Sequence, residues 1–228
     1  MARLADSLVG KRVLVTQALD FMGPALVEGF RGHGATVVTG DQPLKEPGAA
    51  EALVRSAGEI DVLVANLSFP APSTPAAEVG DEEWREVFAH LVDPLPRLVR
   101  AVLPQMTARG SGKVIVMGSA AALRGMRRAS TYSAARGAQV AYVRAVGTEV
   151  APLGVQVNLI AQNFVENDAY FPEEVRALPA FQERLRREVP VQRLGTPSED
   201  AMLAVFLASD ECRFMVGQSL PFAGGWVT

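Results

Sequence analysis

The sequence predicts an α/β protein in which helices cover both faces of a doubly wound parallel sheet. Short runs of Val, Ile and Leu alternate regularly with longer stretches of helical periodicity, which is the order of β–α–β units. The short runs are apolar at nearly every position, as strands are when both faces of their sheet are covered. Hydrophobic residues form 49% of the chain and charged residues 21%, so the chain can bury a full core.

The predicted strands are short and rich in β-branched residues. The second of them ends at a Gly40-Asp41 turn. In chain order they are residues 11–16 (KRVLVT), 35–39 (ATVVT), 61–65 (DVLVA), 113–118 (KVIVMG), 155–160 (VQVNLI) and 218–222.

The predicted helices fill the intervals between these strands. In chain order they are residues 24–32, 46–57, 81–109, 130–151 and 198–209. Two Pro-rich stretches, 43–47 and 69–75, are expected to be loops inside the unit. No linker, internal repeat or low-complexity tract divides the chain, so we expect one domain spanning residues 1–228 of the 228.

Charge and composition argue against several function classes. The 22 basic and 25 acidic residues give a net charge of −3, whereas nucleic-acid binders usually carry a basic excess. The single cysteine, Cys212, excludes an internal disulfide and a multi-cysteine metal site, and we expect a free thiol. His33 and His90 lack the spacing of a histidine metal motif. We therefore expect neither a nucleic-acid partner nor a bound metal.

The chain shows no sign of a membrane or export signal. Its apolar runs are too short to span a bilayer. The N-terminus, MARLADSLVGKRVLVT, has no apolar core before a small-residue cleavage site. These features predict a cytoplasmic protein without a membrane partner.

The loop after the first strand lacks the glycines that a dinucleotide requires. Such glycines allow a tight turn and a close approach of the backbone to a pyrophosphate at a helix N-terminus. The loop reads TQALDFMG, in which only Gly23 remains. Gln17 and Phe21 carry side chains where a cofactor needs space, and Asp20 adds negative charge. Asp41 is a contrary signal, because an acid there would suit a ribose hydroxyl, although it also suits a simple turn.

A serine, a tyrosine and an arginine could act together in proton transfer, although their spacing by itself also fits a tyrosine and an arginine on a solvated helix face. Ligands bind beyond the carboxyl ends of the strands in such sheets, and Ser119 follows the strand 113–118. Tyr132 and Arg136 are four residues apart and so share a helix face. A nearby guanidinium lowers the pKa of a tyrosine, which is ordinarily about 10. Ser119 can then hold a substrate hydroxyl while Tyr132 removes its proton.

These segments resemble the short-chain dehydrogenase/reductase superfamily over essentially the whole chain. The segments that carry the resemblance are DVLVAN, GKVIVMGSAAA, YSAAR, GVQVNLIA, LASDE and GQSLPFAGGW. The resemblance implies a Rossmann-like fold. Four departures affect the family's cofactor site: the first loop has lost two glycines, Arg136 replaces the lysine that holds the nicotinamide ribose, Leu91 replaces a helical asparagine, and Gln162-Asn163 replaces Pro-Gly.

Within that superfamily, the combination of TxxxxFxG with S-x12-Y-x3-R is similar to the halohydrin dehalogenases. That resemblance implies a carbon–halogen lyase with a Ser119–Tyr132–Arg136 triad and no nicotinamide. It implies that vicinal haloalcohols become epoxides with release of halide, and that azide, cyanide or nitrite can open epoxides in reverse. It also implies a homotetramer, built as a dimer of dimers.

The resemblance places a halide site where nicotinamide would lie. Backbone N–H groups and aromatic edges suit a large, weakly hydrated anion. We expect Gln162, Asn163, Phe164 and Val165 to form this nest and Phe21 its opposite wall. Tyr170, with Phe171, would close the pocket as a lid.

Two other functions remain compatible with the sequence. One is an atypical NAD(P)-dependent short-chain reductase, which Asp41 and the intact fold favour and which Gln17, Phe21, Leu91 and Arg136 oppose. The other is a non-catalytic scaffold on the same fold, which the retained Ser119–Tyr132 spacing opposes. Arg184, Arg186 and Arg187 are expected on the exposed side of a helix.

Overall fold

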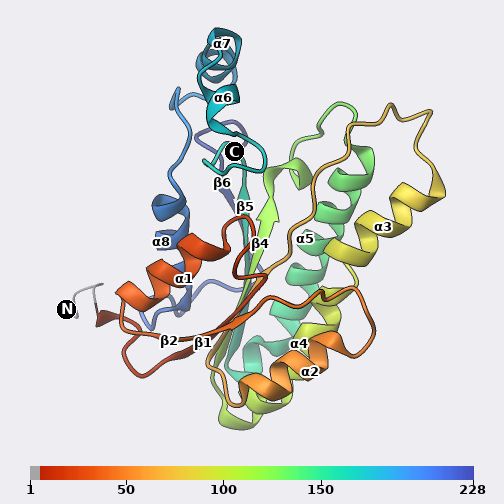
Figure 1. The fold of residues 1–228 in the computed structure, drawn as a ribbon. Coiled ribbons are helices and arrows are strands. Elements are labelled where there is room, and N and C mark those ends of the chain that lie inside the picture. Colours follow the sequence, from red (N-terminus) through yellow and green to blue (C-terminus); the bar gives the residue numbers. More distant parts are fainter. Residues whose placement is uncertain (1–5) are drawn as a thin grey trace.

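Six parallel strands form one sheet in the computed structural model, which describes residues 6–228 (Figure 1). The spatial order of the strands is β2-β1-β3-β4-β5-β6, so the predicted doubly wound parallel fold is confirmed. The strands are β1 (Arg12–Thr16), β2 (Thr36–Gly40), β3 (Val62–Asn66), β4 (Gly112–Ser119), β5 (Val155–Gln162) and β6 (Ser219–Phe222).

Helices pack on both faces of this sheet. Figure 1 shows α1 and α8 together on one face, with α2, α4 and α5 on the other. The helices are α1 (Gly23–Gly32), α2 (Ala49–Ala57), α3 (Asp81–Leu91), α4 (Pro94–Arg109), α5 (Ser130–Val150), α6 (Glu173–Arg176), α7 (Pro179–Glu188) and α8 (Pro197–Ala208). None of the helices within residues 6–228 combines the length and apolar character needed to cross a bilayer.

The strands are apolar at consecutive positions because alternate side chains enter different cores. Val13 and Val15 join the core under α1 and α8, whereas Leu14 joins the core under α2, α4 and α5. All three are fully buried. Complete burial of one such side chain is worth about 1.5–3 kcal/mol. This two-sided burial explains why the strands read as unbroken hydrophobic runs.

The predicted helix 81–109 is wrong in one respect: it is two helices, α3 and α4. Pro94 has no N–H to donate and its ring clashes with a carbonyl one turn earlier, which interrupts a helix. The interruption leaves the carbonyl of Leu91 at the end of α3, where it accepts a hydrogen bond from Gln139 of α5 at 2.6 Å. The break therefore ties α3 to the helix that carries Tyr132.

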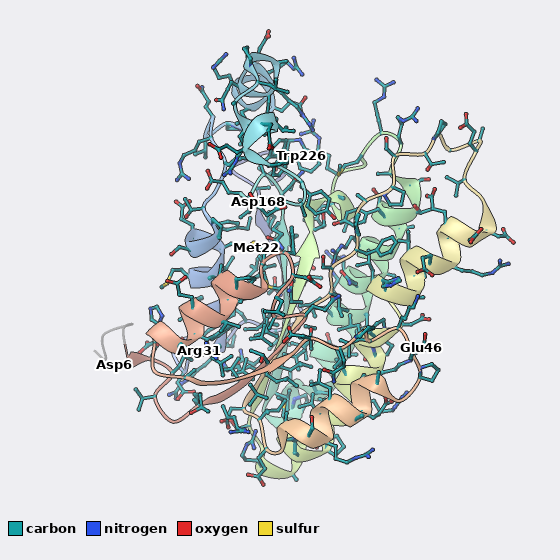
Figure 2. The ribbon with its side chains drawn as sticks, in the orientation of Figure 1. Asp6, Met22, Arg31, Glu46, Asp168 and Trp226 are labelled. Atoms are coloured by element: carbon teal, nitrogen blue, oxygen red, sulfur yellow. The ribbon has the colours of Figure 1, made fainter. Side chains whose placement is uncertain are left out.

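Two short helices, α6 and α7, project beyond the carboxyl ends of the strands (Figure 1). Phe181 and Leu185 of α7 belong to a third apolar cluster, which also contains Phe164 and Trp226. Figure 2 labels Trp226 and Asp168 toward this end of the molecule. The segment between β5 and α8 thus covers the sheet edge where ligands are expected.

Candidate active site

A cavity of about 230 Å³ opens at the carboxyl ends of β4 and β5. It is smaller than most pockets for drug-sized ligands, so it fits a small substrate. Nearly all residues that the sequence singled out line it together. They are Phe21, Ser119, Tyr132, Gln162, Asn163, Phe164, Val165 and Tyr170, with Phe171 beside them.

Ser119 and Gln162 enter the cavity from paired strand ends. They are the last residues of β4 and β5 and lie opposite each other in the register of the sheet. The Ser119 Oγ accepts a hydrogen bond from the Ala121 N–H at 3.2 Å. That bond uses a lone pair, so the hydroxyl proton can be donated to the Tyr132 oxygen or to a ligand oxygen.

Arg136 lies beneath Tyr132 on α5 and does not line the cavity. Its guanidinium carbon is 5.0 Å from the centre of the Tyr132 ring. Its Nη1 donates to the Met117 carbonyl at 3.1 Å and to Gln139 Oε1 at 3.0 Å. With only 2% of its surface exposed, the cation is fixed in a poorly solvated place, where its field is strong. The predicted helical spacing thus produces a buried Tyr–Arg pair.

The pKa of Tyr132 reflects competition between burial and a cation. Burial raises the pKa of the phenol, but the positive charge of Arg136 opposes burial, and the polar groups of Arg136, Ser119 and Tyr170 also favour the phenolate. The net effect lowers the pKa of Tyr132 below its ordinary value of 10. A tyrosine in this setting can act as a general base.

Tyr170 has the opposite protonation behaviour. Burial is the main cause of its raised pKa, and the neighbouring Tyr132 raises it further. Its hydroxyl donates to the Phe69 carbonyl at 2.9 Å. Two adjacent tyrosines whose pKa values are driven apart can be assigned different tasks. Tyr132 is the group suited to take a proton, and Tyr170 remains a neutral donor and wall.

Phe21 and Tyr170 form an aromatic wall. Their rings meet edge to face with centroids 5.6 Å apart. Phe21 comes from the loop after β1, and Tyr170 from the segment after β5 that the sequence analysis treated as a lid. Aromatic ring edges carry partial positive charge, so this wall is compatible with an anion.

The predicted nest of backbone N–H groups is wrong for two of its members. The Asn163 N–H donates to the Phe222 carbonyl at 3.1 Å, and the Phe164 N–H donates to the Asn163 side chain at 2.8 Å. Both donors are used internally because the chain turns sharply here. The isolated bridge between Val165 and Gly195 uses groups on either side of Val165, so the Val165 N–H stands outside the bridge.

Gln162 instead presents its side chain. The residue is 4% exposed, and neither its amide nitrogen nor its amide oxygen has a hydrogen-bond partner within the described residues. An unpaired buried amide is costly. Because Gln162 lines the cavity, a bound ligand can supply the missing partners.

The first loop does not fit a dinucleotide. The Gln17 side chain accepts a hydrogen bond from the Ser68 N–H at 2.6 Å and so spans the place that a glycine would leave open. The Asp41 carboxylate accepts from the Leu19 N–H at 3.0 Å, so it serves the loop rather than a ribose. Pro24 removes an N–H from the first turn of α1, and such N–H groups are what bind a pyrophosphate.

Arg184 is a cavity residue that the sequence analysis missed. Its side chain is 45% exposed on α7, as the sequence predicts, and it also lines the cavity, as do Met126 and Asn167 from their loops. Arg184 is three residues after the buried Phe181, which places both on one face of the helix. That spacing is the signal that could have found it.

Metal ligands are not assembled in this part of the chain. Residues 6–228 contain no group of three or more His, Cys, Asp or Glu side chains that could hold an ion.

Comparisons with known proteins agree on the fold family. A family model described as enoyl-(acyl carrier protein) reductase matches residues 38–227. The 3-oxoacyl-acyl-carrier-protein reductase of Escherichia coli strain K12 is 29% identical, over 95% of this chain and 97% of that protein.

Two solved structures with dehalogenase descriptions are also similar. One, described as a dehalogenation enzyme, is 30% identical with a TM-score of 0.90, over 97% of this chain and 100% of that chain. The other, a halohydrin dehalogenase bound to ethyl (2S)-oxiran-2-ylacetate, is 28% identical with a TM-score of 0.87, over 95% and 97%. Both reductases and dehalogenases therefore resemble this chain along nearly its whole length, and the chain belongs to the short-chain dehydrogenase/reductase superfamily.

Proposed function

We propose that this protein is a nicotinamide-independent halohydrin dehalogenase, which converts small vicinal haloalcohols to epoxides and releases halide. The observation that carries the proposal is the pairing of Tyr132 with the buried cation Arg136. Tyr132 faces a cavity of about 230 Å³ in which Phe21 forms a wall, and Arg136 lies beneath it. A base, a hydroxyl-binding serine and an aromatic wall thus surround a space that suits a small molecule.

The reaction requires only proton removal and an intramolecular displacement. Ser119 donates a hydrogen bond to the substrate hydroxyl, and the Tyr132 phenolate takes the hydroxyl proton. The alkoxide oxygen attacks the neighbouring carbon from the side opposite the halogen. A carbon–oxygen bond forms, the carbon–halogen bond breaks, and the halide leaves with the bonding electrons. Tyr132 then returns its proton to solvent. Positioning supplies much of the acceleration in such a step.

The departing halide needs donors on the far side of the substrate. The Val165 N–H and the unpaired Gln162 amide are the groups we assign to this role. The edges of Phe21 and Tyr170 complete the anion's surroundings. Weak donors of this kind suit a large anion that must also be released.

The dehalogenase neighbours support this proposal, whereas the reductase relatives favour hydride transfer. The feature that distinguishes the two activities is the space beside the first loop, where a reductase would bind the pyrophosphate of its cofactor. Gln17, Asp41 and Pro24 leave no pyrophosphate cradle there. The local structure therefore favours the lyase activity over the reductase activity.

Halide release without nicotinamide tests the proposal. Wild type, Tyr132→Phe and Tyr142→Phe would be incubated with 1,3-dichloro-2-propanol, and chloride would be measured over time. Tyr142 lies on the same helix but outside this cavity, so Tyr142→Phe is a matched control. We expect release by wild type and Tyr142→Phe, and a loss of roughly 10²–10⁴-fold in Tyr132→Phe, as for removal of a general base.

Two results would contradict the proposal. One is unchanged release by Tyr132→Phe, which would place the base elsewhere. The other is no release of chloride, or of bromide from brominated analogues, by a folded wild type. Fluorescence titration with NADH and NADPH on the same sample would then test the reductase activity directly.

A further inference from the structure

Arg184 is the one charged residue among the described residues that line the cavity. The polar groups around it, such as Ser119, Gln162 and Asn167, belong to neutral side chains. A single cation in a mostly apolar pocket fixes the orientation of a ligand that carries the opposite charge. The mechanism proposed above has no task for this guanidinium.

The position of Arg184 is set by buried neighbours. Its guanidinium carbon lies 5.2 Å from the centre of the Phe164 ring, and Phe164 is 2% exposed. Phe181 and Leu185 anchor α7 in the same apolar cluster. The face of the Phe164 ring attracts the guanidinium. The charge therefore keeps a defined position, although 45% of the Arg184 side chain is exposed.

Arg184 can exchange its ion pair with Glu188 for a contact with a ligand at little cost in stability. Within residues 6–228 its guanidinium makes one ion pair, from Nε to Glu188 Oε2 at 3.2 Å. Glu188 also receives a hydrogen bond from Arg187 at 3.0 Å. Exposed ion pairs between helical residues of this spacing contribute little to stability. Glu188 therefore keeps a cation when Arg184 turns to a ligand.

We propose that Arg184 selects haloalcohols that carry a carboxylate, which its guanidinium binds. This inference rests on the proposed function. The planar guanidinium fork matches a carboxylate, whereas the described residues that line the cavity provide no second cation for a phosphate dianion. Arg184 enters the cavity from α7 over the Phe164 ring, whereas Phe21 enters it from the loop after β1.

Matched substrates test the charge preference. The acid 4-chloro-3-hydroxybutanoate and its neutral amide have nearly the same shape, and the acid is ionised at pH 7. Both would be assayed with wild type, Arg184→Gln and Arg186→Gln in a halide-free buffer of low ionic strength. Arg186 lies on the same helix outside the cavity lining. We expect wild type and Arg186→Gln to favour the acid about tenfold in kcat/KM, and Arg184→Gln to show a ratio near one.

A second arm asks whether Arg184 holds the halide instead of the carboxylate. Inhibition of amide turnover by bromide would be compared between wild type and Arg184→Gln. Equal inhibition supports the proposal, because the variant then alters only recognition of the substrate carboxylate. Weaker inhibition in the variant, or equal use of acid and amide by wild type, would overturn it while dehalogenation itself remained established.

Binding of unreactive ligands separates this inference from the proposed function. Affinities for 3-hydroxybutanoate and 3-hydroxybutanamide would be measured by calorimetry with the same three proteins. A preference for the acid that disappears only in Arg184→Gln supports the carboxylate site even if neither chlorinated compound reacts. No preference in wild type removes the carboxylate site whatever the outcome of the activity assay.

Discussion

Gln17 and Phe21 show how a loop can lose glycines and keep their backbone conformation. Their φ angles are +44° and +52°, in the left-handed region that favours glycine. A non-glycine residue there costs roughly 1–2 kcal/mol. The amide of Asn66 offsets this strain by donating to the carbonyls of Gln17 and Asp20 at 2.9 and 3.1 Å. The loop therefore keeps a tight turn, and side chains occupy the space that glycines would leave open.

Gly23 is the loop glycine that cannot be replaced. A Cβ atom at this position would overlap the Ala18 carbonyl. The overlap is with the backbone of the loop itself, so the turn between β1 and α1 requires this glycine.

The charge and shape of Arg136 lead to a prediction for the pH profile. In Arg136→Lys, a lysine cannot reach both the Met117 carbonyl and Gln139 in the planar arrangement of the guanidinium. The cation that lowers the pKa of Tyr132 is then displaced, so that pKa rises. We expect kcat/KM for halide release at pH 7 to fall roughly tenfold or more, within the contribution of a general base, and the rising limb of the profile to move to higher pH.

The matched control for this experiment is Arg186→Lys, which changes an exposed arginine on α7. Its profile should coincide with that of wild type. An Arg136→Lys enzyme with reduced activity but an unmoved pH profile would show that Arg136 acts on folding or binding rather than on the ionisation of Tyr132.

At the scale of single elements, α5 contains glycines with opposite requirements. A Cβ atom on Gly137 would meet nothing within 4 Å, whereas one on Gly147 would lie 2.7 Å from the Gly217 nitrogen. Gly147 thus lets α5 approach the segment before β6, and Gly137 serves no packing purpose within the described chain.

These two glycines predict opposite stability changes from the same substitution. Gly137→Ala should stabilise the protein by about 1 kcal/mol through helix propensity, which raises Tm by about 2–4 °C in a chain of this size. Gly147→Ala should destabilise it, because backbone must move to admit the methyl group. Thermal unfolding of both variants checks this pair. Equal shifts of the two would contradict it.

The break between α3 and α4 is hard to predict from the sequence pattern. Helical periodicity continues through residues 81–109, so a pattern-based prediction joins the two helices. Pro94 predicts the boundary, because it lacks an N–H, but only if this signal is weighted above the helical periodicity. The consequence lies outside the element, because the freed Leu91 carbonyl supports Gln139 and, through it, Arg136.

For the whole molecule, Asp200 links stability to pH. It lies in the first turn of α8, on the sheet face shared with α1, and is fully buried. Neither carboxylate oxygen has a hydrogen-bond partner in the described chain. Burial raises the pKa of this carboxyl from 3.8 to about 7. The native state therefore keeps a proton that the unfolded chain loses at lower pH.

The direction of the pH effect follows from this difference. Between about pH 4 and 7 the unfolded state binds fewer protons, so the stability contributed by Asp200 is complete below pH 4 and is lost as pH rises to 7. Asp200→Asn cannot ionise. We expect it to stabilise the protein more at pH 8 than at pH 5, by up to about 4 kcal/mol at the higher pH.

Urea unfolding at both pH values measures this difference. Asp168→Asn, at an exposed carboxylate, provides the comparison and should show little pH-dependent gain. If Asp200→Asn followed the wild-type pH dependence, the carboxylate would be ionised in the folded protein and paired with a group on another element.

The homotetramer expected from the family resemblance stays a prediction.

The sequence predicts the parallel sheet correctly, and it singles out Ser119, Tyr132 and Arg136 as candidate site residues, which the structure brings together. Hydrophobic periodicity marks the strands because burial on two faces is a local requirement. Strand-end position and helical spacing placed Ser119, Tyr132 and Arg136, because each depends on geometry within one element.

The contacts that complete the cavity join distant parts of the chain and could not be predicted from the sequence. The hydrogen bond from Tyr170 to the Phe69 carbonyl, the internal use of the Asn163 and Phe164 N–H groups, and the arrival of Arg184 over Phe164 all join different elements. Loops between regular elements carry no periodic signal, and their conformations follow from packing against partners far away in the sequence. For that reason the spacing of the candidate base Tyr132 and Arg136 could be predicted from the sequence, whereas the shape and charge of the pocket depend on contacts between distant segments.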